Sequence, residues 1–305
     1  WPGGIPPEVV AVGDKAAGAA TSGEITQVGQ GVRVDLKSND PFKRWVQTSV
    51  IRGTANGTVS AIAYAALGDI TADQFNALAK TQRDLNADVR LTNRQNVVFR
   101  ALSEEQLEIL YKAIEVIGMA QPGAELARDV VACPGADTCN IAITQSRGLA
   151  KAIGEALEEE GLAEVGGVRI NISGCTNSCG QHHASDIGFF GAERRAHGQA
   201  APGYQMLLGG YVGEEQIFFG EKALRVPAKN APQAVTRVVR RFAEERSAGE
   251  TFRAWMDRSG GASAVAVGLA DLDHFPTPEE NPDFFVDFGE TGPFVSEVGD
   301  SECAV

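Results

Sequence analysis

The sequence A-C-P-G-A-D-T-C at residues 132–139, followed by S-G-C-T-N-S-C-G at residues 173–180, decides how this chain is interpreted. The two stretches hold four cysteines in two close pairs: Cys133 and Cys139, then Cys175 and Cys179. Four thiolates are the usual ligand set of a cubane iron–sulfur cluster. Glycine and proline crowd both pairs, as a backbone wrapping closely around such a centre would require. The pattern predicts an iron–sulfur cluster and redox chemistry.

Three other uses of the thiols compete with a cluster. Structural zinc also takes four thiolates, but its ligand pairs usually have about two to four intervening residues, so the longer gap in the first pair fits poorly. A zinc-stabilised interaction module without catalysis is therefore an alternative. Two disulfides would need an oxidising compartment and would leave Cys303 unpaired. Buried inert thiols are the remaining alternative.

Composition limits the class of protein. The chain has 305 residues, 43% hydrophobic and 22% charged, and no apolar run long enough to cross a bilayer. We therefore expect a cytoplasmic protein that does not bind membranes. The formal net charge of −13 argues against a nucleic-acid partner, because phosphate binding depends on clustered Lys and Arg. The dense basic run at 237–241 is interpreted as a solvated helix face.

The N-terminal part predicts a linker and then a ferredoxin-like half-domain. Residues 1–44 are interpreted as a linker or extension with one short strand at 31–36, and residues 45–120 as the half-domain. Capping boxes at Thr71 with Gln74 and at Ser103 with Gln106 predict two helix starts. Expected elements are strands at 45–52, 58–65, 89–92 and 96–100, and helices at 71–86 and 103–118. The order β-α-β-β-α that follows the first strand is that of a ferredoxin-like sandwich.

The second part predicts a mixed α/β domain at 121–265 that carries the cysteines, which makes the whole chain α+β. A helical pattern begins after Cys139 and closes at Gly161, so we expect its N-terminal amides to face the thiolates. Further expected elements are strands at 168–172, 186–190, 205–208, 216–219 and 223–226, and helices at 234–245 and 251–257. Residues 266–305 are interpreted as an extended acidic C-terminal tail.

The residues around the cysteines resemble a known family. The two quoted stretches, S-R-G-L at 146–149 and the continuation Q-H-H at 181–183 are similar to the signature of the sirohaem-dependent sulfite and nitrite reductases. Further similar segments are G-D-I-T at 68–71, R-L-T at 90–92 with Q-N at 95–96, G-F-F-G at 188–191, V-P-A-K at 226–229 and S-E-C-A at 301–304. The resemblance covers residues 45–304, so residues 121–265 become an iron–sulfur and sirohaem domain.

This resemblance implies an enzyme with two coupled cofactors. All four cysteines would bind a [4Fe–4S] cluster, and Cys179 would also bridge to the sirohaem iron, which makes it the catalytic cysteine. The implied reaction is the six-electron reduction of sulfite to sulfide or of nitrite to ammonia. The implied partners are the small oxyanion and an electron donor, either ferredoxin or a flavoprotein. The sequence does not choose between the two substrates.

Five residues in the similar segments are expected to contact the cofactors: Arg90, Gln95, Asn177, Gln181 and Lys229. Sirohaem is rich in carboxylates, so cations should surround it, while amides beside Cys179 can donate hydrogen bonds to sulfur or macrocycle. The competing interpretations are ordinary turn residues for Asn177 and Gln181, and a loop cap for Lys229.

Other polar residues are weaker candidates. Arg52, Arg94 and Arg147 are further cations in similar segments, although Arg94 is equally explained as a solvated charge at a strand end. His182 and His183 are candidate proton donors, but a histidine pair beside such a loop more often makes supporting hydrogen bonds.

Two departures restrict the expectation. The chain resembles only the second half of the family's two related halves, and it begins with Trp1 rather than Met. We therefore expect the C-terminal half of such an enzyme, with the N-terminal half as its partner. In the 45–52 segment, Ser49 stands where the family usually has Asn, and Ile51 where it has Arg. A second alternative is thus a cluster-only electron carrier or degenerate paralogue without a full sirohaem pocket.

Overall fold

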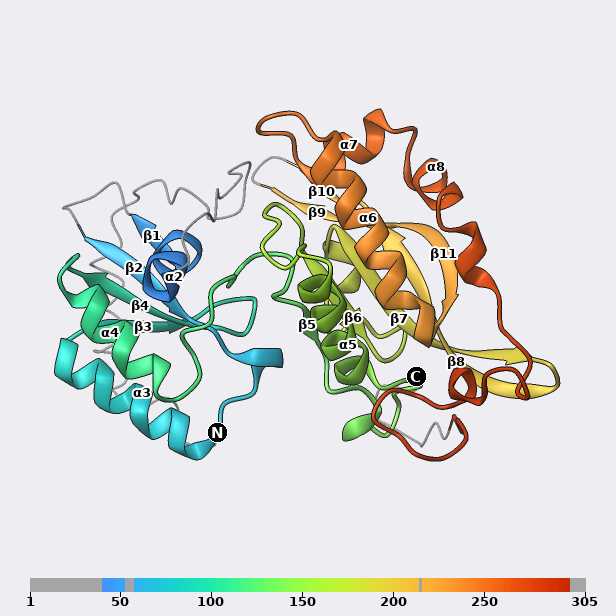
Figure 1. Cartoon of the computed structure of the whole chain (residues 1–305), viewed down its shortest axis with the longest axis horizontal. Helices are drawn as coiled ribbons and strands as arrows, with labels where there is room; N and C mark the ends of the chain where they lie inside the picture. Colours follow the sequence, from blue (N-terminus) through green and yellow to red (C-terminus); the bar gives the residue numbers. More distant parts are fainter. Residues whose placement is uncertain (1–39, 53–57, 214–215, 297–305) are drawn as a thin grey trace, which may run out of the picture.

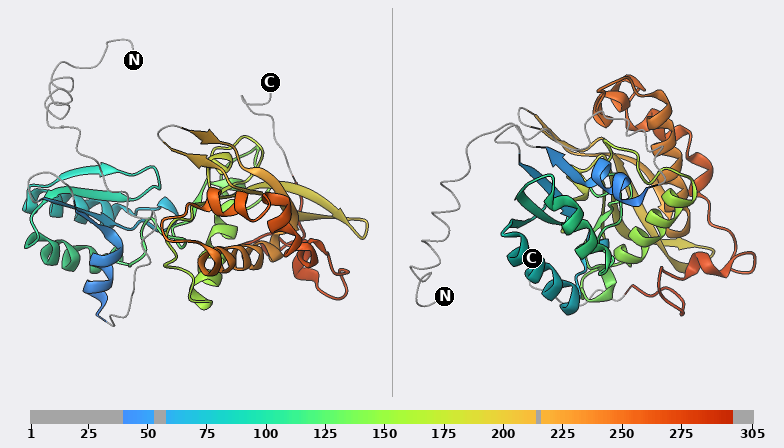
Figure 2. Two further views of the ribbon diagram at one scale, coloured as in Figure 1. Left: turned by 90° about the horizontal axis from the view of Figure 1, so that it is seen from above. Right: turned by 60° about the vertical axis from the view of Figure 1, so that its left-hand side comes forward.

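The computed structural model describes residues 40–52, 58–213 and 216–296. Over these residues the chain forms two α/β units that lie side by side in all views (Figures 1 and 2). Each unit has its own hydrophobic core. The strand expected at 31–36 and Cys303 lie outside the described residues, and the expected domain boundaries stay predictions.

The first unit has the predicted β-α-β-β-α order. Its elements are α2 (Pro41–Ser49), β1 (Val50–Arg52), β2 (Val59–Ala63), η1 (Ala66–Gly68), α3 (Ala72–Leu85), β3 (Asp88–Leu91), β4 (Val97–Leu102) and α4 (Gln106–Glu115). The strands form an antiparallel sheet in the order β1-β2-β4-β3. The core includes the fully buried side chains of Trp45, Phe99 and Leu110.

Local signals explain how these elements begin. Thr71 and Gln74 form the predicted reciprocal capping box at the start of α3. At α4 only half of the box forms: the Gln106 Oε1 atom accepts from the Ser103 backbone N–H. The strand expected at 45–52 is wrong over most of its length, because α2 occupies it. Asp40 caps that helix through its side chain, and Trp45 on α2 fills the core.

The second unit is a five-stranded mixed sheet covered by helices on one face (Figure 1). Its strands are β5 (Val131–Ala132), β6 (Ile170–Ser173), β7 (Ile187–Ala196), β8 (Gln199–Leu208) and β11 (Glu221–Pro227), beside a small β9 (Tyr211–Val212) and β10 (Ile217–Phe218) hairpin. Its helices are η2 (Gly135–Asp137), α5 (Ser146–Glu159), η3 (His182–Ala184), η4 (Ala228–Asn230), α6 (Ala231–Glu245), α7 (Phe252–Arg258) and α8 (Ala262–Val267).

The direction of the strands positions the cysteines. The sheet order is β11-β8-β7-β6-β5, in which β5, β6 and β7 are parallel and β8 and β11 are antiparallel to their neighbours. Ala132 on β5 pairs with Ile172 on β6. The two strands therefore leave the sheet at the same edge, and a cysteine loop follows each of them.

The C-terminal segment is not the simple extended tail that was expected. After α8 it forms η5 (Ala270–Asp273) and η6 (Pro282–Phe285). Three phenylalanines of this segment are buried: Phe275, Phe285 and Phe294. Burial of these aromatic side chains is favourable, and it fastens the segment to the second unit. Among the described residues, no helix has the length and hydropathy needed to cross a bilayer.

Candidate iron–sulfur site

The four cysteines gather at the edge where β5 and β6 end. Cys133 directly follows β5, and its backbone N–H donates to the Ile172 carbonyl on β6 at 3.1 Å. The Gly174 N–H donates to the Cys133 Sγ atom at 3.2 Å, which joins the two cysteine loops. Cys133, Cys139 and Cys175 are half-buried, whereas Cys179 is exposed.

The electrostatics of Cys175 show how close the thiols lie. Burial raises the pKa of the Cys175 thiol, and a hydrogen bond from the Asn177 backbone N–H opposes that effect. The neighbouring Cys133, Cys179 and Cys139 each raise the same pKa further, because a second negative charge nearby disfavours the thiolate. All three other cysteines therefore lie within electrostatic range of Cys175.

Glycines allow the loops to approach one another. A Cβ atom on Gly174 would lie 2.8 Å from the Thr144 carbonyl oxygen and 2.9 Å from the Gly135 Cα atom. Gly135 has a φ of +65°, and a Cβ atom there would lie 2.4 Å from the Ser146 Oγ atom. No larger residue fits at either position without moving backbone atoms.

Helix α5 begins later than expected. The predicted start directly after Cys139 is wrong, because the chain makes turns through residue 145 before α5 begins at Ser146. The helix start still reaches the thiols: the Ser146 hydroxyl donates to the Cys133 carbonyl at 2.7 Å and lies 3.4 Å from the Cys133 Sγ atom. The part of the prediction that fails is that the first helix amides directly follow Cys139.

The donor set and the spacing can be compared with candidate metals. No group of three or more His, Cys, Asp or Glu side chains in the described parts of the chain could hold a single metal ion. The thiolates that bind a cubane cluster lie farther apart than the ligands of a single metal ion, because the irons and sulfides of the cluster occupy the space between them. Four thiols from two glycine-lined loops, one of them accepting an N–H bond, fit a [4Fe–4S] cluster.

Two predicted cofactor residues lie in the second cysteine loop. Asn177 is exposed between Cys175 and Cys179, and Gln181 is exposed just after Cys179. Gln181 has a φ of 57°, and its backbone N–H donates to the Ser178 carbonyl at 2.7 Å. Both side chains are therefore free to face a ligand beside Cys179.

The other three predicted cofactor residues lie outside the loops. Arg90 is exposed on β3 and pairs with Asp88 on the same strand. Gln95 is exposed in the turn between β3 and β4, where its side chain packs against Gly68. The Lys229 ammonium group lies 4.5 Å from the centre of the Phe288 ring. Within the described residues, no hydrogen bond or ion pair joins Arg90 or Lys229 to either cysteine loop.

The weaker arginine candidates differ in position. Arg52 forms an exposed pair with Glu104. Arg147, on the first turn of α5, pairs with Asp69 and lies 3.9 Å from Asp137, which belongs to the first cysteine loop. Arg147 therefore lies beside the first cysteine loop. The solvated-charge interpretation of Arg94 is wrong, because this side chain is buried.

The two histidines behave unequally. His182 is fully buried, and burial, with His183 beside it, lowers its pKa to about 4. A buried neutral imidazole is poorly placed to donate protons to a substrate. The rings of His182 and His183 lie 4.2 Å apart, and His183 is half-buried.

Two residues that were not among the predicted site residues complete the site. Asp287, on the segment after η6, accepts a hydrogen bond from the Gln145 backbone N–H at 2.9 Å. Ser173, at the end of β6, accepts from the Gly180 N–H at 3.1 Å. Ser173 lies within the quoted stretch at 173–180, so the sequence could have identified it, but nothing in the sequence connects Asp287 to a loop so distant along the chain.

Comparison with known proteins agrees with this geometry. Residues 123–267 match the family described as "Nitrite and sulphite reductase 4Fe-4S domain", and residues 53–117 match "Nitrite/Sulfite reductase ferredoxin-like half domain". The first match corresponds to the second unit of the fold, and the second match to the first unit. Together they place the chain in a class of iron–sulfur redox proteins. The chain belongs to the nitrite and sulfite reductase family, whose cofactors, a [4Fe–4S] cluster and sirohaem, fit the four-thiol site.

Named relatives cover part of the chain. It is 32% identical to the assimilatory ferredoxin-dependent nitrite reductase of Haloferax mediterranei over 56% of this chain and 30% of that protein. It is 35% identical to the ferredoxin–nitrite reductase of Synechococcus elongatus over 59% of this chain and 36% of that protein. The solved structure of the Mycobacterium tuberculosis NirA protein is similar with a TM-score of 0.60 and 29% identity, over 69% of this chain and 40% of that one. The chain thus spans well under half the length of these relatives.

Proposed function

We propose that this chain is the C-terminal half of a sirohaem-dependent sulfite or nitrite reductase. The observation that carries the proposal is the convergence of four thiols where the parallel strands β5 and β6 end. When bound, the [4Fe–4S] cluster and sirohaem supply the one-electron chemistry for reducing a small oxyanion by six electrons. The assignments of individual residues below are part of this proposal.

The thiols divide into two roles. Cys133, Cys139 and Cys175 are half-buried and would bind the cluster but not the sirohaem. Cys179 is the exposed member of the set, so its sulfur is best placed to serve both the cluster and the sirohaem iron. The Gly174 N–H bond to the Cys133 Sγ atom would stabilise negative charge on the ligands and so favour the reduced cluster.

Polar residues around the loops would bind the rest of the cofactor. Asn177 and Gln181 flank Cys179 and are exposed, which supports hydrogen bonding to sulfur or macrocycle. Arg90 would contact a sirohaem carboxylate only by exchanging Asp88 for it. Gln95 would reach the cofactor from the turn between β3 and β4, and Lys229 from η4. Cationic residues for the oxyanion would come largely from the N-terminal half, and ferredoxin is the proposed electron donor because the relatives above are named for it.

Cofactor analysis tests the proposal. The full-length polypeptide should be co-expressed with sirohaem synthesis and purified without oxygen, and then analysed for iron, acid-labile sulfide, zinc and extractable tetrapyrrole. We expect about five irons per chain, four from the cluster and one from the sirohaem, with about four acid-labile sulfides and one extractable tetrapyrrole. Reduction of sulfite and nitrite by reduced ferredoxin then identifies the substrate. Zinc without visible absorbance would refute the proposal, and a cluster without sirohaem would favour the electron-carrier alternative.

Cysteine variants assign the ligands. Cys133→Ala should lose most of the iron and sulfide together with the sirohaem. Cys179→Ala should remove the coupling between the two centres. Cys303→Ala is the matched control and should keep both cofactors, since that cysteine lies outside the four. Full cofactor content in Cys133→Ala would contradict the ligand assignment.

A further inference from the structure

The peptide directly after Cys179 is held from both sides by strand β6. The Gly180 N–H donates to the Ser173 Oγ atom at 3.1 Å, and the Asn171 side-chain amide donates to the Gly180 carbonyl at 2.9 Å. A Cβ atom on Gly180 would lie 2.1 Å from the Ile172 carbonyl oxygen. The backbone at Gly180 is therefore pressed against β6 and bonded to it in both directions.

The Ser173 side chain that accepts the Gly180 N–H also contacts a buried histidine. The His182 Nδ1 atom lies 2.8 Å from the Ser173 Oγ atom. His182 is fully buried, and Ser173 is 1% exposed. The His182 Nε2 atom is also buried and has no hydrogen-bond partner among the described residues. In the described part of the chain, Ser173 is thus the only hydrogen-bond partner of this ring, and a buried polar ring without that partner would be costly.

The donors and acceptors allow two orders of hydrogen bonds, which differ in the tautomer of His182. In one order, the Ser173 oxygen accepts the Gly180 N–H, and its own proton is available for the His182 Nδ1 atom. In this order the ring is neutral with its proton on Nε2; in the other order the ring is also neutral, and its Nδ1–H donates to the second lone pair of the Ser173 oxygen. The lowered pKa of His182, caused by burial and by the neighbouring His183, agrees with a neutral ring. Bonds in such a chain polarise and strengthen one another.

We propose that His182 and Ser173 are positioning residues that fix the Gly180 peptide and, through it, the direction of the Cys179 sulfur. The inference rests on the proposed function in one respect, that Cys179 is the bridging ligand. Electronic coupling through a shared thiolate depends on its orientation, so a loosened loop would weaken the coupling while leaving the other three thiolates in place.

Four variants separate positioning from general stability. Ser173→Ala removes the oxygen that accepts the Gly180 N–H, and His182→Leu removes the ring nitrogen behind it. His182→Asn keeps a polar acceptor close to the position of the Nδ1 atom. Ser185→Ala is the matched control, because Ser185 is equally buried in the same loop but bonds to the His182 and Ile187 carbonyls rather than to Gly180.

Hydrogen exchange measures the loop, and spectroscopy measures the coupling. We expect Ser173→Ala and His182→Leu each to raise amide exchange in the 175–182 peptide by about tenfold. The double variant should exchange no faster than Ser173→Ala alone, because both changes break one chain of bonds. In loaded protein, both should lose the electron paramagnetic resonance and optical signature of coupled centres while retaining iron. His182→Asn and Ser185→Ala should behave as the wild type in both measurements.

Clear outcomes would overturn the inference. Unchanged exchange in Ser173→Ala, additive effects in the double variant, or an equal effect of Ser185→Ala would each contradict it. If the bulkier His182→Leu change prevents folding, Ser173→Ala carries the test, because it removes only one buried oxygen. Exchange is also measurable in cofactor-free protein, so absence of the cofactors would refute the proposed function without deciding this one.

Discussion

Gly174 shows how single residues define the cysteine site. A Cβ atom at this position would meet the Thr144 carbonyl and the Gly135 Cα atom, which are both backbone atoms and cannot rotate away. The Gly174 N–H also bonds to the Cys133 Sγ atom. The residue therefore contributes both the close approach of the two loops and one of the bonds that joins them.

Replacing this glycine should damage the cofactor site more than the fold. We expect Gly174→Ala to lower the free energy of unfolding by about 1–3 kcal/mol, as overpacking does, and to lose most of the bound iron. Gly292→Ala is the matched control, because a Cβ atom there would meet nothing within 4 Å. Urea unfolding and iron analysis check both variants. Full iron content in Gly174→Ala would show that the two cysteine loops can bind the cluster without the close approach at Gly174.

Residues differ in how far the sequence predicts their role. The cysteines and the capping box at Thr71 are specified by short spacings, which are visible in the chain itself. Arg94 could not be assigned in this way, because a charge beside a turn is ordinarily solvated. Its burial depends on carbonyls of residues 125–129, which only the folded chain brings beside it.

At the scale of elements, the strand order explains why distant loops meet. Parallel pairing of β5 with β6 sends both cysteine loops to one edge, and α5 begins beside them at Ser146. Strand β6 was predictable from the alternation of apolar and polar residues at 168–172. The start of α5 was not, because the turns through residue 145 are held by contacts with Gly174 and Asp287 rather than by a local cap. The helix α2 was also missed, although Asp40 at its N-cap followed by Pro41 is a local start signal in the sequence.

The segment after η6 acts as a brace on the first cysteine loop. Asp287 is buried and accepts backbone hydrogen bonds from Gln145 and Phe288. We expect Asp287→Ala to cost about 1–3 kcal/mol, because it leaves the Gln145 N–H buried without a partner. Asp283→Ala, an exposed position on η6, should be within about 0.5 kcal/mol of the wild type. Thermal unfolding compares the two variants, and equal losses would contradict the brace.

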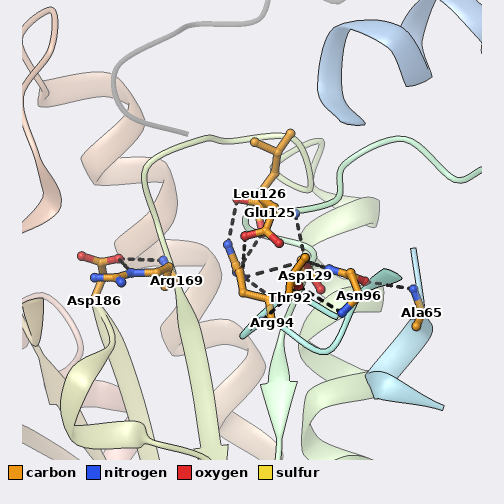
Figure 3. A network of polar contacts seen from close by, with 9 residues as sticks. All are labelled: Ala65, Thr92, Arg94, Asn96, Glu125, Leu126, Asp129, Arg169 and Asp186. Carbon is orange, nitrogen blue, oxygen red and sulfur yellow. Dashed lines mark hydrogen bonds and ion pairs between the residues drawn. The ribbon is translucent and has the colours of Figure 1, made fainter. Parts of the chain in front are cut away.

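At the scale of the whole molecule, a buried polar network joins the two units (Figure 3). Arg94, from the turn before β4, donates to the carbonyls of Glu125 and Asp129 at 2.7 Å each. Asn96 donates to the Asp129 Oδ2 atom at 2.6 Å and accepts from the Ala65 N–H. The network thus connects the sheet of the first unit to the segment that leads into β5.

Loss of the Arg94 side chain from this network should strongly lower the free energy of unfolding. Arg94 is 6% exposed, so Arg94→Met would leave the buried carboxylate of Asp129 and the half-buried carboxylate of Glu125 without their cation. Breaking a buried pair from one side typically costs about 3–5 kcal/mol. Arg90→Met is the matched control four positions earlier. Its pair with Asp88 is exposed and should contribute less than about 1 kcal/mol.

The pH dependence distinguishes this mechanism from simple loss of packing. Burial raises the pKa of Glu125 and of Asp129, while Arg94 lowers both. A carboxyl with a raised folded-state pKa binds more protons when folded, so its contribution to stability falls as pH rises from the ordinary value through the raised one. Without Arg94 both pKa values should rise further. The stability lost in Arg94→Met, measured by urea unfolding, should therefore be larger at about pH 7 than at about pH 5. Protonation at lower pH removes the unpaired negative charge of the two carboxyl groups, whereas it does not change a loss of packing. An equal loss at both pH values would therefore mean that Arg94 stabilises the protein through its volume.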